Sequence, residues 1–173
     1  VAAARELAET LGGNGIAVRV DDRDNVNPGF KYAEWELKGV PLRLELGPRD
    51  LDADQVVAVS RIDRSKTPVS RGEAPASVAE LLEKIQRDLL AAARDRREAA
   101  TRTVETWDEF REAIEAGGFL KARFAGNAED EDRIQKETKA TVRVVPLEGA
   151  GEKGPCVLTG KTTDRWVYFA RAY

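Results

Sequence analysis

The sequence contains no histidine, no methionine and a single cysteine, Cys156, among its 173 residues. Without histidine, this chain cannot hold a Ser-His-Asp triad, a histidine general base or a histidine metal ligand. One cysteine allows neither an internal disulfide nor a Cys-x-x-Cys pair of thiolate ligands. Methionine is absent even from position 1, so we expect that Val1 is not the native start and that the chain is part of a longer protein.

Long apolar runs are also missing. No stretch of about 18 or more apolar residues occurs, which predicts no membrane-spanning segment and no membrane partner. The 28 basic and 31 acidic side chains leave a net charge of −3. Such a chain cannot bind nucleic acid indiscriminately through phosphates, so nucleic-acid binding would need a local patch with selected base contacts. The charged N-terminus does not resemble a secretory signal, and with the single cysteine this predicts a cytoplasmic protein.

The hydrophobic pattern predicts two modules of mixed α/β structure. In 41–46, Leu42 and Leu44 alternate with Arg43 and Glu45, as expected of a half-buried strand. The other expected elements of the first module are a helix at 2–11, a strand at 16–20, a helix at 30–38, a strand at 56–61 and a strand or hairpin arm ending near Val69. Helices alternating with strands are typical of an α/β sheet, and we expect a first strand to precede Val1.

Two capping boxes predict the next helix starts, at Ser77–Glu80 and at Thr106–Glu109. The first helix extends to about Ala100 and ends in a charged, solvated connector. The remaining expected elements are a strand at 119–124, a helix at 128–137, a strand at 141–146 and a docked apolar run at 166–173. We therefore expect a first domain at 1–103 that includes the connecting helix, and a second at 104–173.

A few side chains are candidates for chemistry. The carboxylates between Asp21 and Asp24 suit a divalent cation, but they lack EF-hand spacing and favour an ordinary polar loop. Arg49 follows a strand end, where α/β sheets place ligands; it contacts a phosphate or base edge there, or Asp50 merely caps a turn. Cys156 lacks a cysteine or histidine partner, which favours a buried, unreactive thiol.

Other candidates have equally plain alternatives. Arg43 and Glu45 share one strand face, as a base-reading pair or as a surface ion pair that stabilises little. Lys31 is a phosphate contact or a solubilising charge. The aromatic residues Phe30, Tyr32 and Trp35 either stack on unpaired bases or belong to the core. The sequence assembles no nucleophile, base and oxyanion site, so it is typical of a binding module.

The run from Val20 to Asp50 closely resembles the anticodon-binding domain of prolyl-tRNA synthetases of the archaeal and eukaryotic type. Its core, Lys38–Arg43 with Gly47–Asp50, is shared more loosely with the threonyl, histidyl and glycyl enzymes. The second half resembles the extra C-terminal domain of the prolyl type in four motifs: Trp107–Phe110, Gly117–Phe119, Lys136–Thr141 and Phe169–Tyr173. The resemblance covers essentially the whole chain.

This resemblance implies an α/β anticodon-binding domain with a mixed sheet flanked by helices, followed by a small α+β domain. The family activates proline with ATP and transfers it to tRNA, so it implies the tRNA(Pro) anticodon loop as a partner. It also implies a class II catalytic domain, preceding this chain, that holds ATP and Mg and forms most of a homodimer. This chain itself would hold no cofactor. The terminal carboxylate turns toward the active site in the family, which would place Tyr173 near the substrate.

The resemblance also names site residues. The family binds the anticodon with the region that here contains Asp22, Arg23, Lys31, Glu36, Arg43, Glu45 and Arg49. The family's C-terminal domain often binds zinc through four cysteines, whose matching positions here are Ala125, Asp130, Cys156 and Thr159. Since thiolates supply the affinity of such sites, we predict no zinc. Packing must then hold this domain together, with an expected core of Phe119, Phe124, Ile134, Val144 and Trp166.

Two functions from other classes remain open. One is a non-catalytic protein-interaction module derived from an anticodon-binding domain, which the acidic net charge favours slightly. Retention of Gly47–Asp50 and of the whole segment 28–39 argues against it. The other is a small-molecule enzyme on an α/β sheet, which is disfavoured by the absence of histidine and of a phosphate-binding glycine-rich loop.

Overall fold

The computed structural model describes residues 1–147 and 151–171. Contacts within the chain divide it into two compact units, Val1–Ala91 and Ala92–Tyr173. The division falls inside one long helix, α4 (Ala74–Ala99), and each unit has a hydrophobic core of its own. Among the helices of the described ranges, none has both the length and the apolar composition to cross a membrane.

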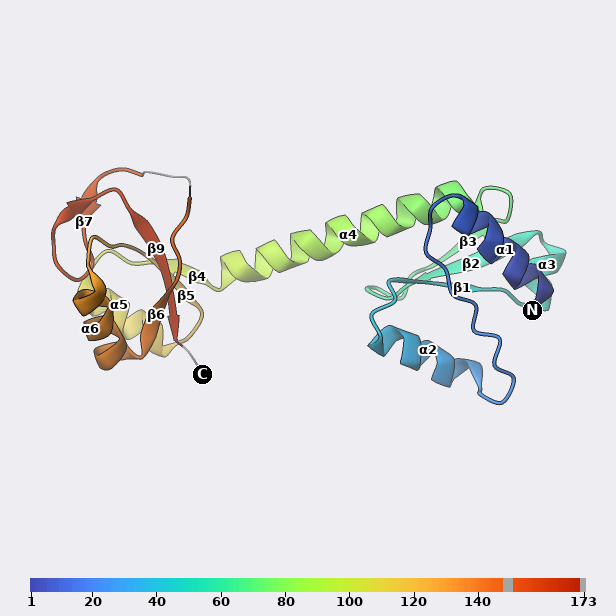
Figure 1. Ribbon diagram of the computed structural model, residues 1–173, viewed down its shortest axis with the longest axis horizontal. Coiled ribbons are helices and arrows are strands. Elements are labelled where there is room, and N and C mark those ends of the chain that lie inside the picture. The colour runs from blue at the N-terminus through green and yellow to red at the C-terminus, as the bar shows by residue number, and fades with distance from the viewer. Residues whose placement is uncertain (148–150, 172–173) are drawn as a thin grey trace. The chain divides into compact units, whose positions relative to one another are not determined.

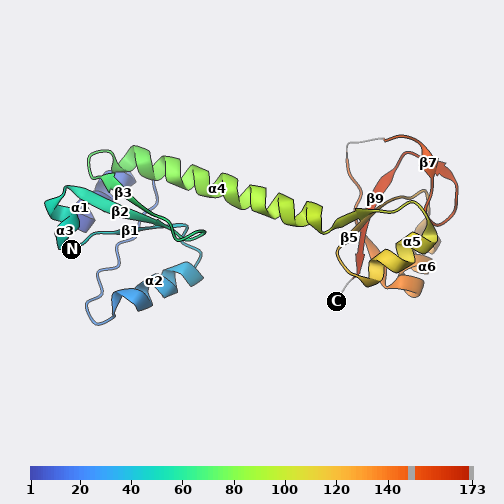
Figure 2. The same cartoon turned by 180° about the vertical axis from the view of Figure 1, so that it is seen from behind.

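The first unit is a three-stranded antiparallel sheet with helices on both faces (Figures 1 and 2). Its elements before α4 are α1 (Ala2–Gly13), α2 (Pro28–Leu37), β1 (Leu42–Glu45), α3 (Pro48–Asp52), β2 (Gln55–Ser60) and β3 (Lys66–Ser70). The first turns of α4 and the helix α1 cover one face, where Leu7, Leu11, Val56, Ala58, Val69, Ala74 and Val78 form the core. The opposite face, which carries Arg43 and Glu45, lies toward α2.

The strand expected at 16–20 does not form. In the part of the chain that the structure describes, this segment pairs with no strand; Ile16 packs partly on the core and Val18 is 42% exposed. Alternating β-branched residues become a strand only where a neighbouring strand satisfies their backbone groups, and no described strand pairs with them. The described strands of this unit are antiparallel to one another.

Helix α4 begins at Ala74, three residues before the capping box expected at Ser77. The backbone N–H of Ser77 already donates to the carbonyl of Glu73, at 3.0 Å, so its side chain lies within the helix and caps nothing. Pro75 allows the earlier start, because proline lacks the N–H that the first turn of a helix would leave unpaired.

The second unit is a four-stranded sheet covered on one face by two helices (Figure 1). Its elements after α4 are β4 (Thr101–Thr103), α5 (Trp107–Glu115), β5 (Phe119–Arg123), α6 (Ala128–Thr138), β6 (Ala140–Val144), β7 (Gly154–Pro155), β8 (Thr162–Thr163) and β9 (Trp166–Arg171). The strand order is β4-β5-β9-β6, with β4 parallel to β5 and the other pairs antiparallel, so the mixed sheet of this chain lies here. Strand β9 is central, which confirms that the apolar C-terminal run docks over 166–171.

The start of α5 and part of the expected core are confirmed. The hydroxyl of Thr106 accepts from the backbone N–H of Glu109 at 3.3 Å, and the Glu109 carboxylate accepts from the backbone N–H of Thr106 at 3.3 Å. Phe124 and Ile134 are buried. The ring of Phe169 meets those of Phe110 and Phe124 edge-on, with centroids 5.2 and 5.5 Å away.

Other core assignments were wrong. Phe119 is 37% and Val144 53% exposed, and Trp166 is only half-buried. Side chains alternate across a strand, and in β5 it is Leu120 and Ala122 that enter the core beneath the helices. Phe119 therefore projects from the opposite face of the sheet.

Candidate nucleic-acid interface

Helix α2 is capped at its start, ends before a glycine, and exposes part of its side chains to solvent. The side chain of Asn27 caps its first turn by accepting from the backbone N–H of Phe30 at 2.9 Å, and Pro28 occupies the first helical position. The helix ends before Gly39, whose φ of +85° favours glycine. No residue of α2 is fully buried, and Phe30 is 58% exposed. The aromatic and charged side chains of α2 are thus partly available to a partner.

The first cluster joins α2 to strand β1. The guanidinium Cζ of Arg43 lies 3.9 Å from the centroid of the Tyr32 ring. Its Nη1 donates to Glu36 Oε1 at 2.9 Å, and its Nε and Nη2 donate to Glu45 Oε1 at 3.0 and 2.9 Å. The second oxygen of Glu45 pairs with Lys66 of β3 at 3.4 Å. Of these residues, Tyr32, Glu36 and Arg43 border a small open cavity of about 10 Å³, whose other lining residues are Trp35, Val40, Val59 and Arg61.

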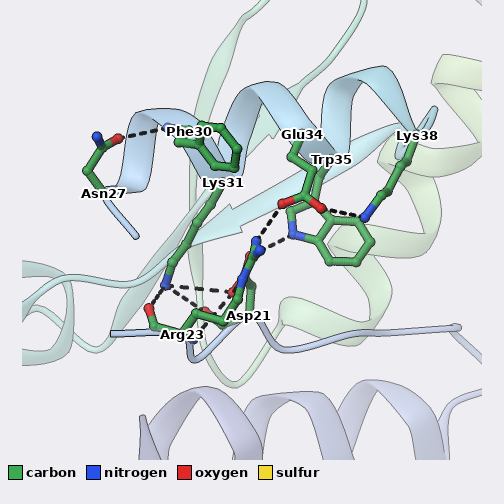
Figure 3. A network of polar contacts seen from close by, with 8 residues as sticks. All are labelled: Asp21, Arg23, Asn27, Phe30, Lys31, Glu34, Trp35 and Lys38. Atoms are coloured by element: carbon green, nitrogen blue, oxygen red, sulfur yellow. Dashed lines mark hydrogen bonds and ion pairs between the residues drawn. The ribbon is translucent and has the colours of Figure 1, made fainter. Parts of the chain in front are cut away.

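The second cluster fastens the loop after α1 onto α2 (Figure 3). Asp21 accepts from Arg23 at 2.8 and 2.6 Å and from the indole N–H of Trp35 at 2.8 Å. Arg23 also donates to Glu34 at 2.7 Å. From the other end of the helix, the Lys31 ammonium donates to the backbone carbonyls of Asp21 and Arg23. A second cavity, of about 170 Å³, is lined by Arg19, Val20, Asp21, Asp22, Arg23, Glu34, Trp35 and Lys38.

Hydrogen bonds keep the second cluster ionised. Those from Arg23 and Trp35 hold the pKa of Asp21 well below its usual value. Those from Lys38 and Arg23 lower the pKa of Glu34, and the bonds to Asp21 and Glu34 raise that of Arg23. Asp21, Glu34 and Arg23 are therefore charged at neutral pH, and Arg23 pairs with both carboxylates within the chain.

The structure brings together three of the seven residues predicted to contact tRNA: Glu36, Arg43 and Glu45. Lys31 and Arg23 lie in the second cluster, where their cations bind this chain's own acceptors. Arg49 stands apart from both clusters and is exposed at the start of α3, whereas Asp22 borders the second cavity and pairs with Arg5 of α1 at 2.5 Å. The predicted position of Tyr173 lies outside the described residues.

Sequence reasoning missed Arg61 and Lys66 at the first cluster. Arg61 continues the alternation of Val57 and Val59 along β2, which places it on the same face as Arg43, the register partner of Val59. Lys66 is likewise the partner of Val59 on the other side. The alternation was visible in the sequence, but the pairing of the three strands that puts these cations beside Glu36 and Glu45 was not.

The four positions that match zinc-binding cysteines do not fit a zinc ion. The Cys156 sulfur accepts from the backbone N–H groups of Ala125 and Thr159, at 3.4 and 3.5 Å. Burial raises the pKa of the Cys156 thiol, but these hydrogen bonds outweigh burial and lower it. Asp130 accepts from the backbone N–H of Asn127 at the start of α6. A structural zinc site needs four nitrogen or sulfur ligands, and these positions offer one sulfur.

Two family descriptions match the chain. "Anticodon binding domain" matches residues 1–88, and "Prolyl-tRNA synthetase, C-terminal" matches residues 107–173. The chain belongs to the anticodon-binding domain family. The first of these matches contains α2, β1 and both clusters, and the second contains all of α5 to β9, so the resemblance to the C-terminal part of prolyl-tRNA synthetase is confirmed over both halves.

Individual relatives of this chain point to the same family. A proline–tRNA ligase of Porphyromonas gingivalis is 43% identical over 170 residues, which cover 98% of this chain and 34% of that protein. One of Chloroflexus aurantiacus is 48% identical over 162 residues, covering 91% and 33%. The crystal structure of prolyl-tRNA synthetase from Cryptosporidium parvum, complexed with L-proline and AMP, is similar with a TM-score of 0.89 and 29% identity, over 98% of this chain and 36% of that one. The α/β class is thereby confirmed, and the chain spans about a third of the length of these relatives.

Proposed function

We propose that this chain recognises the anticodon of tRNA(Pro) as part of a longer proline–tRNA ligase. The observation that carries the proposal is the first cluster, in which Arg43 lies on Tyr32 and holds Glu36 at the rim of an open cavity. It lies within residues 1–88, the part that matches the anticodon-binding description.

The chemistry of the cluster suits unpaired guanine. Anticodon bases are unstacked in part, so a protein can reach their Watson–Crick edges and stack on their faces. The proline anticodons share two adjacent guanines, whose N1–H and N2–H₂ groups donate to carboxylates. Arg43 occupies Oε1 of Glu36, while Oε2 has no hydrogen-bond partner among the residues that the structure describes. Arg43 therefore holds Glu36 in place through Oε1 and leaves Oε2 available to accept a hydrogen bond from a base.

The remaining residues divide between support and contact. Glu45 uses both of its oxygens, on Arg43 and Lys66, so it fixes the arginine. Lys31 and Arg23 hold the loop against α2. Phe30 adds an exposed ring on which a further base can stack. Arg49 and Asp22 complete the proposed contact set from the edges of the unit.

The rest of the activity belongs to the longer protein in this proposal. Residues 1–103 read the anticodon, and residues 104–173 pack against a class II catalytic domain that binds ATP and Mg and forms the homodimer. Tyr173 would lie near its active site. The described residues contain no group of three or more metal-ligating side chains, and this proposal requires none of them to bind Mg.

Direct binding tests the proposal. The chain is titrated with a proline-type anticodon stem-loop and with the same loop carrying adenine in place of both guanines, at two salt concentrations. We expect tighter binding of the guanine loop at both. Equal binding that disappears with salt would reduce the interaction to phosphate attraction. Absence of binding would overturn the proposal in favour of a protein-interaction module.

A single-residue variant sharpens this test. Glu36→Gln retains an acceptor for Arg43 but replaces the free carboxylate oxygen by an NH₂ donor, which opposes the N1–H of guanine. We expect it to lose about 1–3 kcal/mol of the preference for guanine and little stability. Glu83→Gln is the matched control, because Glu83 is an exposed carboxylate on α4 whose single ion pair among the described residues is with Arg87. Retained guanine preference in the Glu36 variant would remove Glu36 from the interface.

A further inference from the structure

Arg61 is anchored at the rim of the first cluster. It directly follows β2, and its backbone N–H donates to the carbonyl of Pro41 at 3.0 Å, which extends the pairing with β1 by one position. Its side chain lines the same cavity as Tyr32, Glu36 and Arg43. It therefore belongs to the surface on which the proposed function places RNA.

The Arg61 side chain has no polar partner among the residues that the structure describes. Its Nε is buried from solvent and has no hydrogen-bond partner in the described ranges. Among those residues it also forms no ion pair, whereas Arg43 and Lys66 each bind a glutamate. Because this Nε is enclosed by protein atoms, a ligand would be bound through the two terminal nitrogens of the guanidinium, which donate to none of the described residues.

The balance of charges in the first cluster also leaves Arg61 without a counter-charge among the described residues. Arg43 and Lys66 pair with two carboxylates, Glu36 and Glu45, and Arg61 adds a third cation that lines the cavity. Both carboxylates are engaged by the other two cations. The unmatched positive charge is thus that of Arg61, and it attracts an electron-rich acceptor to the cavity although the whole chain is acidic.

We propose that Arg61 is a further RNA-contacting residue, which donates to an acceptor of the bound anticodon loop. The planar fork of guanidinium N–H groups matches two acceptors of RNA: the O6/N7 edge of guanine and a phosphate oxygen. The inference rests on the proposed function and adds to it a donor that opposes the acceptor Glu36.

The experiment compares Arg61→Ala and Arg61→Lys with the unaltered chain, using the guanine stem-loop and its adenine counterpart at several salt concentrations. Melting temperatures are recorded for every protein. Arg64→Ala is the matched control, since Arg64 is exposed in the same turn, carries the same charge and does not line the cavity.

Two results support the proposal and distinguish the acceptors. If Arg61 contacts guanine, Arg61→Ala binds the guanine loop about tenfold or more weakly, loses preference over adenine, and is not rescued by lysine. If it contacts phosphate, both loops lose affinity equally, the slope of log K against log salt falls by about 1, and lysine restores most of the binding. In either case Arg64→Ala binds like the unaltered chain.

Other results overturn it. Unchanged affinity of Arg61→Ala for both loops, with the unaltered chain still preferring guanine, overturns this inference and leaves the proposed function standing. A lower melting temperature with unchanged affinity assigns Arg61 a purely structural role. Failure of the unaltered chain to bind either loop overturns the proposed function, and this inference with it.

Discussion

The guanidinium Cζ of Arg43 lies 3.9 Å from the centroid of the Tyr32 ring, while its nitrogens hold Glu36 and Glu45. Tyr32 belongs to α2 and Arg43 to β1. This one stack therefore fixes both the helix against the sheet and the orientation of the carboxylates that the proposed function uses.

Removing the Tyr32 ring should lower the affinity for the guanine stem-loop more than it lowers the stability of the fold. In Tyr32→Leu, Arg43 loses its stacking surface, worth about 0.5–2 kcal/mol, and the glutamates lose a fixed partner. We expect a comparable loss of affinity for the guanine stem-loop, measured by titration. Tyr32→Phe keeps the ring face and should bind like the unaltered chain. A loss of equal size in Tyr32→Phe would contradict the stacking argument and assign the effect to the hydroxyl.

Arg49 tests the edge of the interface. It is exposed at the start of α3 and makes no ion pair among the described residues, so its substitution costs the fold little. If it contacts a base, Arg49→Ala should weaken binding of the guanine loop by about 1–3 kcal/mol. Arg87→Ala, an exposed arginine on α4, is the control for lost charge. Unchanged affinity in folded Arg49→Ala would take Arg49 out of the contact set.

Asp21 should give the second cluster a characteristic pH dependence. Its pKa in the folded chain lies below the usual value of 3.8, because of its bonds to Arg23 and Trp35. The stability it contributes is therefore complete above pH 3.8 and is lost as the pH falls through the folded pKa. In acid titrations followed by denaturant unfolding, Asp21→Asn should be less stable than the unaltered chain at neutral pH, and the two should converge in acid.

The control for this titration is Asp24→Asn. Asp24 is exposed in the same loop and forms no ion pair in the described ranges. We expect its unfolding free energy to follow that of the unaltered chain at every pH. If the difference between Asp21→Asn and the unaltered chain stays constant down to the lowest pH, the carboxylate charge is not what the loop depends on.

Alanine substitutions at two adjacent glycines should distinguish the cost of backbone strain from the cost of a steric clash. Gly117 and Gly118 both have a positive φ, +77° and +84°. A Cβ at Gly118 would lie 2.4 Å from the carbonyl oxygen of Ala100, whereas one at Gly117 meets nothing within 4 Å. Alanine should therefore cost about 1–2 kcal/mol at Gly117 and distinctly more at Gly118, as measured by thermal unfolding. Equal costs at both positions would mean that the turn moves away from Ala100 freely.

Metal removal should leave the second unit unchanged. Cys156 is enclosed by backbone amides of Ala125 and Thr159 and has no second thiolate beside it. We expect elemental analysis of the purified chain to find well under one zinc per molecule, and a chelator to leave its melting temperature unaltered. One zinc per chain, with a melting temperature that falls on chelation, would contradict the assignment.

Much of the fold follows from near neighbours in the sequence. The alternation around Leu42 and Leu44 defines β1, and Thr106 with Glu109 defines the start of α5, because strand period and capping depend on residues only a few positions apart. The same logic failed at 16–20 and at Ser77. There the pattern was present, but a missing strand neighbour in one case and Pro75 in the other decided against it.

The sequence by itself determined which residue types the site contains. The chain has no histidine, and between Val20 and Asp50 its acidic and basic residues are interleaved with aromatic ones. Only the tertiary structure decided which charge meets which. It sends Lys31 to backbone carbonyls, Arg43 to two glutamates and Tyr32, and leaves Arg61 without an acceptor in the described chain. Such pairings depend on strand register and on the packing of α2 against the loop, which join residues distant in sequence and which no local pattern encodes.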